Sequence, residues 1–167
     1  MLRRTLTLAL AVAALAVAPS ADAKSPWTPY HSQDFVDAAG TVCPFELAGH
    51  IVSDKERYRT TAYFPDGSPR YQEFTGQLII RYTNTATGES VVRNLTGRGD
   101  FEYFADGGFT LYDKGGHFGA GLHPGDDPGA GYYVVTGHGW AVHGDADGHY
   151  TLIEGHGTIE NICVTLS

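Results

Sequence analysis

The distribution of glycine limits the folds that this chain can adopt. All 22 glycines lie between Gly40 and Gly157, and 17 of them lie from Gly97 onward. Glycine at this density breaks helices, which excludes a helical bundle. The glycines follow no Gly-x-y period, which excludes collagen. The chain has 167 residues, of which 42% are hydrophobic, and this is enough for one domain with its own core.

The first 23 residues have the features of a secretory signal peptide. Arg3 and Arg4 precede an apolar run over 6–17, and Ala21-Asp22-Ala23 matches the small-x-small pattern of a cleavage site. A transmembrane anchor would need about 20 apolar residues, and this run is shorter. We therefore predict general secretion, an extracellular location, and a mature chain that begins at Lys24 and has no stable membrane anchor.

The predicted mature chain, residues 24–167, is acidic. Removal of the first 23 residues leaves nine Lys and Arg against 18 Asp and Glu, a net charge of −9 compared with −8 for the whole chain. Nucleic acids and anionic membranes bind surfaces rich in Lys and Arg. Neither is expected as a partner.

The two cysteines, Cys43 and Cys163, are predicted to form a structural disulfide. An even pair near the two ends of a secreted domain is typical of a bridge. In the chain-entropy model, closing a loop of about 120 residues contributes up to about 4–5 kcal/mol. Neither cysteine has the CxxC or Cys-His context of a reactive thiol.

After residue 23 the chain alternates between strands and turns. Period-2 apolar runs are bounded by Gly, Asp and Asn, and no helical spacing is sustained. Thr96-Gly97-Arg98-Gly99 recurs as Thr136-Gly137-His138-Gly139, at an offset of 40 residues, which indicates duplicated hairpins. The predicted long strands span 44–64, 69–83, 90–105, 108–122, 131–144 and 149–165. The first is one kinked strand unless Asp54-Lys55-Glu56 forms a hairpin turn.

Folding the chain at its turns predicts a register with one buried face. If Thr83 pairs with Ser90, apolar or small residues oppose one another along both strands. If Ala105 pairs with Gly108, Tyr103 opposes Thr110 and Phe101 opposes Tyr112. The glycines expected to bend the strands on the inner face are Gly76, Gly97, Gly99, Gly137, Gly139 and Gly157.

These patterns predict an all-β fold. We expect a small antiparallel up-and-down β-barrel of about six to eight strands with duplicated hairpins, in which the first long strand closes against the last. The barrel would form a single domain over 43–167. Residues 24–42 form an N-terminal extension whose place in the barrel is not predicted.

Four short segments support this architecture through a family resemblance. They are Cys43-Pro44-Phe45, Phe64-Pro65-Asp66-Gly67, Thr83-Asn84 with Thr87-Gly88, and Leu95-Thr96-Gly97. In this order they resemble a group of small secreted actinobacterial proteins of uncharacterised function, which are thought to form β-barrels. The architecture is similar to allene-oxide-cyclase-like and lipocalin-like barrels. The matching residues belong to turns and core, so the resemblance implies a fold and no catalytic residue.

Histidine is the enriched reactive residue type, with six of the eight between His117 and His156. A three-residue loop at Ala146-Asp147-Gly148 would place His138 directly opposite His156, close enough to share a metal. A five-residue loop would instead place His138 opposite Glu154. No local motif supplies a third ligand, and we interpret these histidines as solvated strand residues in preference to a metal site.

Arg93 lies on the predicted apolar face. Inside a barrel, its guanidinium could bind the carboxylate or phosphate of a small ligand. Alternatively, it extends to the barrel mouth from a position near the strand end.

The sequence contains no nucleophile elbow, phosphate loop or metalloprotease helix, and no cofactor is predicted. We expect a non-catalytic secreted protein that binds a small molecule, a surface or another protein. The alternative is a small barrel enzyme of isomerase or cyclase type that uses the interior. A cavity with polar groups would favour a ligand carrier or an enzyme, and an interior filled by Phe101, Phe118, Leu78 and Ile80 would leave only surface binding.

Overall fold

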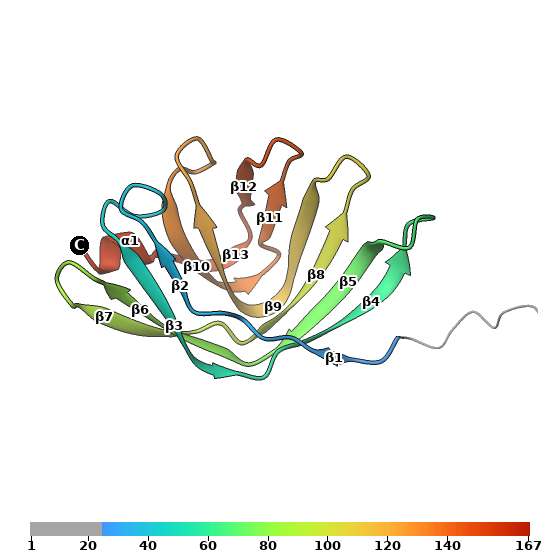
Figure 1. Cartoon of the computed structure of the whole chain (residues 1–167), viewed down its shortest axis with the longest axis horizontal. Coiled ribbons are helices and arrows are strands. Elements are labelled where there is room, and N and C mark those ends of the chain that lie inside the picture. The colour runs from blue at the N-terminus through green and yellow to red at the C-terminus, as the bar shows by residue number, and fades with distance from the viewer. Residues whose placement is uncertain (1–24) are drawn as a thin grey trace, which may run out of the picture.

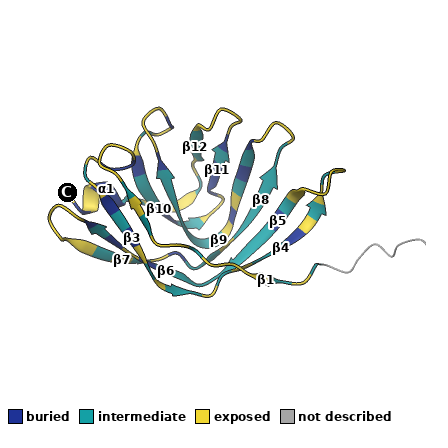
Figure 2. Cartoon of the chain, viewed as in Figure 1, coloured by how far each residue is buried: buried dark blue, intermediate teal, exposed yellow. Residues whose placement is uncertain are grey.

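Antiparallel strands make up almost all of the regular structure, as the sequence predicted. The computed structural model describes residues 25–167, so the predicted signal peptide, 1–23, lies outside the described residues. The strands form a strongly curved fan (Figure 1). Exposed residues concentrate in the loops that connect the strands (Figure 2).

The first seven strands are β1 (Thr28–Pro29), β2 (Phe35–Asp37), β3 (Leu47–Asp54), β4 (Arg57–Tyr63), β5 (Pro69–Gly76), β6 (Leu78–Asn84) and β7 (Ser90–Asn94). The remaining elements are β8 (Gly97–Tyr103), β9 (Phe109–Leu122), β10 (Gly131–His138), β11 (Ala141–Gly144), β12 (Tyr150–Ile153), β13 (His156–Asn161) and the helix α1 (Ile162–Thr165).

The predicted long strands are present, but kinks divide all of them except β9 into two elements. β3 leads into β4 with only Lys55 and Glu56 between them, so Asp54-Lys55-Glu56 is a kink and not a hairpin turn. β3 pairs with β6 and β4 pairs with β5. In the same way, β5 leads into β6, β7 into β8, β10 into β11 and β12 into β13. The six predicted runs therefore appear as eleven of the thirteen strands.

A row of glycines crosses five adjacent strands at the kink. The paired residues, in order across β5, β8, β9, β10 and β13, are Gly76, Gly97, Gly116, Gly137 and Gly157. All except Gly97 have φ between +112° and +151°, which L side chains rarely adopt. At each of the five, an added Cβ would overlap a backbone atom of a neighbouring strand or of the kink beside it. Glycine therefore allows the close backbone approach that lets these strands bend together. We refer to this row as the glycine ladder.

The strands do not close into a barrel, which corrects the predicted architecture. One sheet has nine strands, in the order β1-β4-β5-β8-β9-β10-β13 with β11 and β12 attached, and the other has four, in the order β2-β3-β6-β7. The register of β8 with β9 shifts between Gly97 and Gly99. Beyond this irregularity the second half of β9 pairs with β10, and among the described strands β7 pairs with β6 alone, so β7 is a sheet edge. The predicted closure of the first long strand against the last is also absent among the described residues, because β3 and β4 pair on that side with β2 and β1.

The N-terminal extension lies along the free edge of both sheets. β1 pairs with β4, and β2 pairs with β3. Between them, the carboxylates of Asp54 and Asp34 accept hydrogen bonds from the backbone N–H groups of Ser32 and Ile51, at 2.8 and 2.7 Å. Residues 28–37 thus act as one interrupted strand beside β3 and β4.

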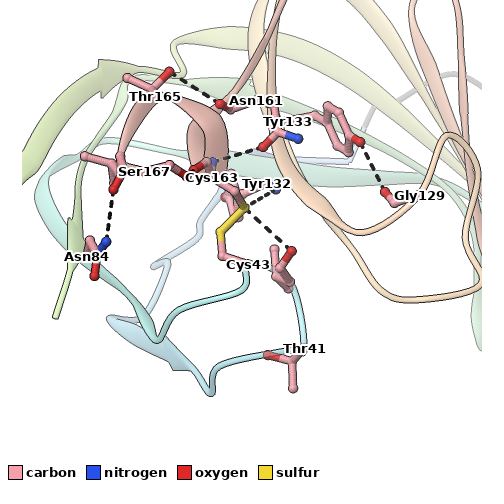
Figure 3. Close-up of a disulfide and its surroundings, with 12 residues drawn as sticks. Thr41, Cys43, Asn84, Gly129, Tyr132, Tyr133, Asn161, Cys163, Thr165 and Ser167 are labelled. Carbon is pink, nitrogen blue, oxygen red and sulfur yellow. Dashed lines mark hydrogen bonds between the residues drawn. A yellow bond between two sulfur atoms is a disulfide. The ribbon is translucent and has the colours of Figure 1, made fainter. Parts of the chain in front are cut away.

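The predicted disulfide between Cys43 and Cys163 is confirmed (Figure 3). It joins the segment between β2 and β3 to α1, with the Cα atoms 5.3 Å apart. Nearby, Asn84 Nδ2 donates a hydrogen bond to the backbone oxygen of Leu166 at 2.9 Å. The main hydrophobic core surrounds the bridge and includes Leu47, Tyr82 and Ile162. The disulfide therefore links the four-stranded sheet to the end of the nine-stranded sheet, where no pairing between the described strands joins them.

The predicted register is correct at one turn and wrong by one residue at another. Thr83 pairs with Ser90, as expected. At the next hairpin, Tyr103 pairs with Phe109 instead of Thr110, because the backbone N–H of Phe104 donates to Gly108 and closes a three-residue loop. A slip of one residue exchanges the two faces of a strand. On β9, the inner face therefore carries Leu111 together with the residues two positions before it and two positions after it.

Candidate functional site

A cavity of about 690 Å³ lies between the inner faces of the two sheets. Its wall comes from the N-terminal edge segment and from β2 to β6 and β8 to β10. Four glycines line it, Gly76, Gly97, Gly99 and Gly119. This volume lies within the range of pockets that hold small organic molecules. Phe101, Phe118, Leu78 and Ile80 line this space and do not fill it.

Aromatic side chains form a continuous wall on the nine-stranded sheet. Phe74 on β5 stacks with Tyr58 on β4, with the ring centroids 5.5 Å apart. Phe74 also packs edge-on against Phe101 on β8 at 5.2 Å. Phe101 in turn stacks with Tyr103 at 5.8 Å. All four line the cavity and are only partly buried, so their faces are available to an apolar ligand.

Two polar groups of the wall already have partners inside the protein. Glu56, in the kink between β3 and β4, accepts a hydrogen bond from Ser32 Oγ at 2.7 Å. Burial raises the pKa of its carboxyl, and the bond from Ser32 opposes this shift. Gln72 on β5 donates to Thr60 Oγ1 at 3.0 Å and accepts from the Tyr103 hydroxyl at 2.9 Å.

Asp113, the last residue of β9 before its irregular segment, differs from these groups. Its side chain lines the cavity and the residue is 8% exposed. Oδ1 accepts a hydrogen bond from the backbone N–H of Gly115 at 2.7 Å. Oδ2 is buried and has no hydrogen-bond partner among residues 25–167. A buried carboxylate oxygen without a partner is costly, and such groups occur at binding and catalytic sites.

Sequence reasoning did not identify Asp113 because of the one-residue slip at the turn before β9. The predicted register put Thr110 and Tyr112 on the inner face, which places Asp113 outside. In the structure, Phe101 pairs with Leu111 and Gly99 pairs with Asp113. We considered a three-residue loop at Ala146-Asp147-Gly148, in the second copy of the repeat, and that loop is present. The same loop length at the turn before β9, in the first copy, would have predicted the observed register.

Arg93 is not part of the cavity wall. Its Nε and Nη2 atoms each donate to Glu160 on β13, and both distances are 2.6 Å. Glu160 also accepts from Thr165 Oγ1 at 2.7 Å. The hydrogen bonds from Arg93 hold the pKa of Glu160 below its ordinary value, against the effect of burial. The Arg93 guanidinium thus binds a carboxylate of the protein and connects the edge strand β7 to β13.

His138 and His156 are direct partners on β10 and β13, with ring centroids 5.4 Å apart. This is the arrangement expected from a three-residue loop at 146–148. That loop forms because the backbone N–H of Asp145 donates to the backbone oxygen of His149 at 2.9 Å. Glu154 lies in the kink between β12 and β13, outside the paired registers. In the part of the chain that the structure describes, no three His, Cys, Asp or Glu side chains are placed to hold a metal ion together.

A second acidic residue organises the loop between β9 and β10. Asp126 accepts backbone hydrogen bonds from His123 at 2.6 Å and from Tyr150 at 2.9 Å. Burial acts to raise the pKa of Asp126, but these two donors and the nearby His123 and His149 together hold it below the ordinary value. Asp126 is not part of the cavity wall, and its contacts are those of a loop anchor.

Comparisons with protein-family models, curated proteins and solved structures found no match to this chain. The resemblance to secreted actinobacterial barrel proteins stays a prediction. Among the described residues, no helix has the length and apolar character needed to cross a membrane.

Proposed function

We propose that this protein is a secreted, disulfide-linked binding protein that holds a small molecule between its two sheets. The observation that carries the proposal is the cavity of about 690 Å³ with aromatic walls, in which polar residues are a minority of the lining. Small-molecule sites commonly combine a concave apolar surface with a small number of polar groups that orient the ligand. The disulfide is consistent with an extracellular location.

Half-buried aromatic rings inside a cavity support this proposal energetically. Phe74 and Phe101 keep part of their surface uncovered in the ligand-free protein. Covering apolar surface contributes roughly 25 cal/mol per Å², so an apolar ligand gains affinity without any change in the fold. The disulfide and the ion pair of Arg93 with Glu160 also connect the two sheets, which favours a preformed site.

The binding function is tested with Nile red, a neutral fluorophore that brightens in apolar surroundings. The mature protein is compared with Leu111→Trp, which places a larger side chain in the cavity wall, and with Tyr112→Trp, which alters the neighbouring exposed residue outside it. We expect Nile red to bind the wild type and Tyr112→Trp equally, and Leu111→Trp at least about 10-fold more weakly. Equal binding to all three proteins would refute the cavity as the site. Native mass spectrometry of the same preparations detects a ligand that co-purifies.

An isomerase or cyclase activity is the second candidate, and one observation favours it. Glu56 lines the cavity with a pKa raised by burial, a property of carboxyls that transfer protons. The test is a ligand that co-purifies with the protein. If the wild type converts this ligand and Glu56→Gln binds it without converting it, the activity is established. A ligand released unchanged by both proteins would establish binding alone.

A further inference from the structure

The unpartnered oxygen of Asp113 indicates what kind of ligand the cavity takes. Asp113 is more than nine-tenths buried, and its Oδ2 has no partner among the described residues, although Oδ1 is occupied by the Gly115 N–H group. Leaving such an acceptor unpaired costs more than a normal hydrogen bond contributes, so a donor supplied by a ligand would be strongly favoured.

The basic side chains on the adjoining strands do not supply that donor. Lys114 Nζ lies 3.3 Å from Asp100 and packs over the ring of Tyr112, on the exposed side of the sheet. Arg98 belongs to the cavity wall, but it is exposed and forms no ion pair with the carboxylates of the described residues. Among residues 25–167, no Lys, Arg or His side chain forms an ion pair with the Asp113 carboxylate.

Apart from Arg98 and His117, the rest of the wall also suits a cation. Leu111 on β9 pairs with Phe101 on β8. The next pair on the same face is Asp113 with Gly99. The faces of aromatic rings attract ammonium and guanidinium groups, and this attraction grows when water is excluded. The net charge of the predicted mature chain, −9, favours the approach of cations over anions.

We propose that the cavity binds a small organic cation with an aromatic or aliphatic body, whose N–H group donates to the Asp113 carboxylate. This inference rests on the proposed binding function and adds the charge of the ligand and the residue that recognises it. Asp113 would determine specificity, and the aromatic wall would supply the apolar contact.

The test uses three probes that share one indole ring: tryptamine, which is cationic, tryptophol, which is neutral, and indoleacetate, which is anionic. Calorimetry measures their affinity for the mature wild type and for Asp113→Asn, which keeps an oxygen for the Gly115 N–H group but removes the charge. Asp147→Asn, at an exposed turn, is the control for the change in net charge. Leu111→Trp is the control for the location of binding.

We expect the wild type and Asp147→Asn to bind tryptamine at least about 10-fold more tightly than tryptophol or indoleacetate, as a hydrogen bond between charged groups predicts. In Asp113→Asn this preference should disappear. Because the mutation removes an unsatisfied buried charge, the ligand-free variant should also melt at a higher temperature than the wild type.

The possible failures are distinguishable. If tryptophol binds as tightly as tryptamine and Leu111→Trp weakens both, the cavity binds ligands but the cation inference is wrong. If Asp113→Asn keeps the preference for tryptamine, or melts at a lower temperature, the role of Asp113 is wrong. If neither the three probes nor Nile red bind the wild type at millimolar concentration, both the inference and the proposed function are wrong.

Discussion

Replacing Gly137 by alanine should separate two costs that glycine avoids in this fold. Gly137 is the β10 member of the glycine ladder, with φ +128°. An added Cβ would overlap the backbone oxygen of His156 and lie 3.0 Å from the Cα atom of Gly157, both on β13. Alanine at such a φ costs about 1–3 kcal/mol in backbone strain. Forcing the two backbones apart costs about 1–3 kcal/mol more.

Gly139 is the matched control because it shares only the first of these costs. It follows the same strand with φ +78°, and an added Cβ would meet nothing within 4 Å. Gly139→Ala should therefore cost about 1–2 kcal/mol, the penalty of the left-handed backbone alone. Gly137→Ala should cost about 2–6 kcal/mol, a large part of the 5–15 kcal/mol that stabilises a typical domain.

Urea denaturation of the mature protein, followed by tyrosine and tryptophan fluorescence, measures both variants against the wild type. We expect the midpoint to fall much further for Gly137→Ala than for Gly139→Ala, with equal slopes if all three proteins unfold in two states. Equal midpoints for the two variants would show that close contact between the backbones of β10 and β13 is not what requires glycine there. The glycine ladder would then be a consequence of backbone dihedral angles alone.

Three further changes test other contacts of the fold. Replacing both cysteines by serine should lower the free energy of unfolding by about 4–5 kcal/mol, and the wild type should lose the same amount in reducing buffer. Asp126→Ala should cost about 2–3 kcal/mol by removing two backbone hydrogen bonds, as measured by urea titration at neutral pH. Arg93→Ala should cost about 1–2 kcal/mol, between the values for exposed and buried ion pairs. Because the folded-state pKa values of Asp126 and Glu160 are lowered, their stabilising contributions are complete above the unfolded-state values, 3.8 and 4.5, and are lost as the pH falls below them. The wild type should therefore lose more stability between pH about 5 and about 2 than Asp126→Ala does, and parallel pH profiles would contradict this assignment.

Local features of the fold followed from the sequence because short-range chemistry determines them. The Asp-Gly turns, the register from Thr83 to Ser90 and the bridge from Cys43 to Cys163 depend on residues near one another or on a single pair. The glycine bend points were also largely visible, although Gly116 was missed and both Gly99 and Gly139 lie outside the glycine ladder.

Whether the sheet closes into a barrel could not be predicted in the same way, because closure depends on small irregularities in the pairing of several strands. The shift between Gly97 and Gly99 and the positive φ angles of Gly115 and Gly116 mark the place where β9 changes partners, from β8 and β11 in its first half to β10 in its second. Periodicity does not report which residue of a strand is left unpaired. The same limit explains the missed site, since a single extra loop residue at the turn before β9 decides whether Asp113 faces the cavity or solvent.

The glycines that curve the sheets also give the cavity its volume. Gly76 and Gly97 belong both to the glycine ladder and to the cavity wall, and Gly99 and Gly119 line the cavity beside them. A side chain at Gly99 would meet Leu111, directly beside Asp113 on β9. A side chain at Gly119 would likewise meet Tyr132 and Leu95, so the missing side chains of Gly99 and Gly119 leave space beside the cavity wall. The high glycine content that excludes a helical fold is, in this arrangement, also what makes room for a ligand.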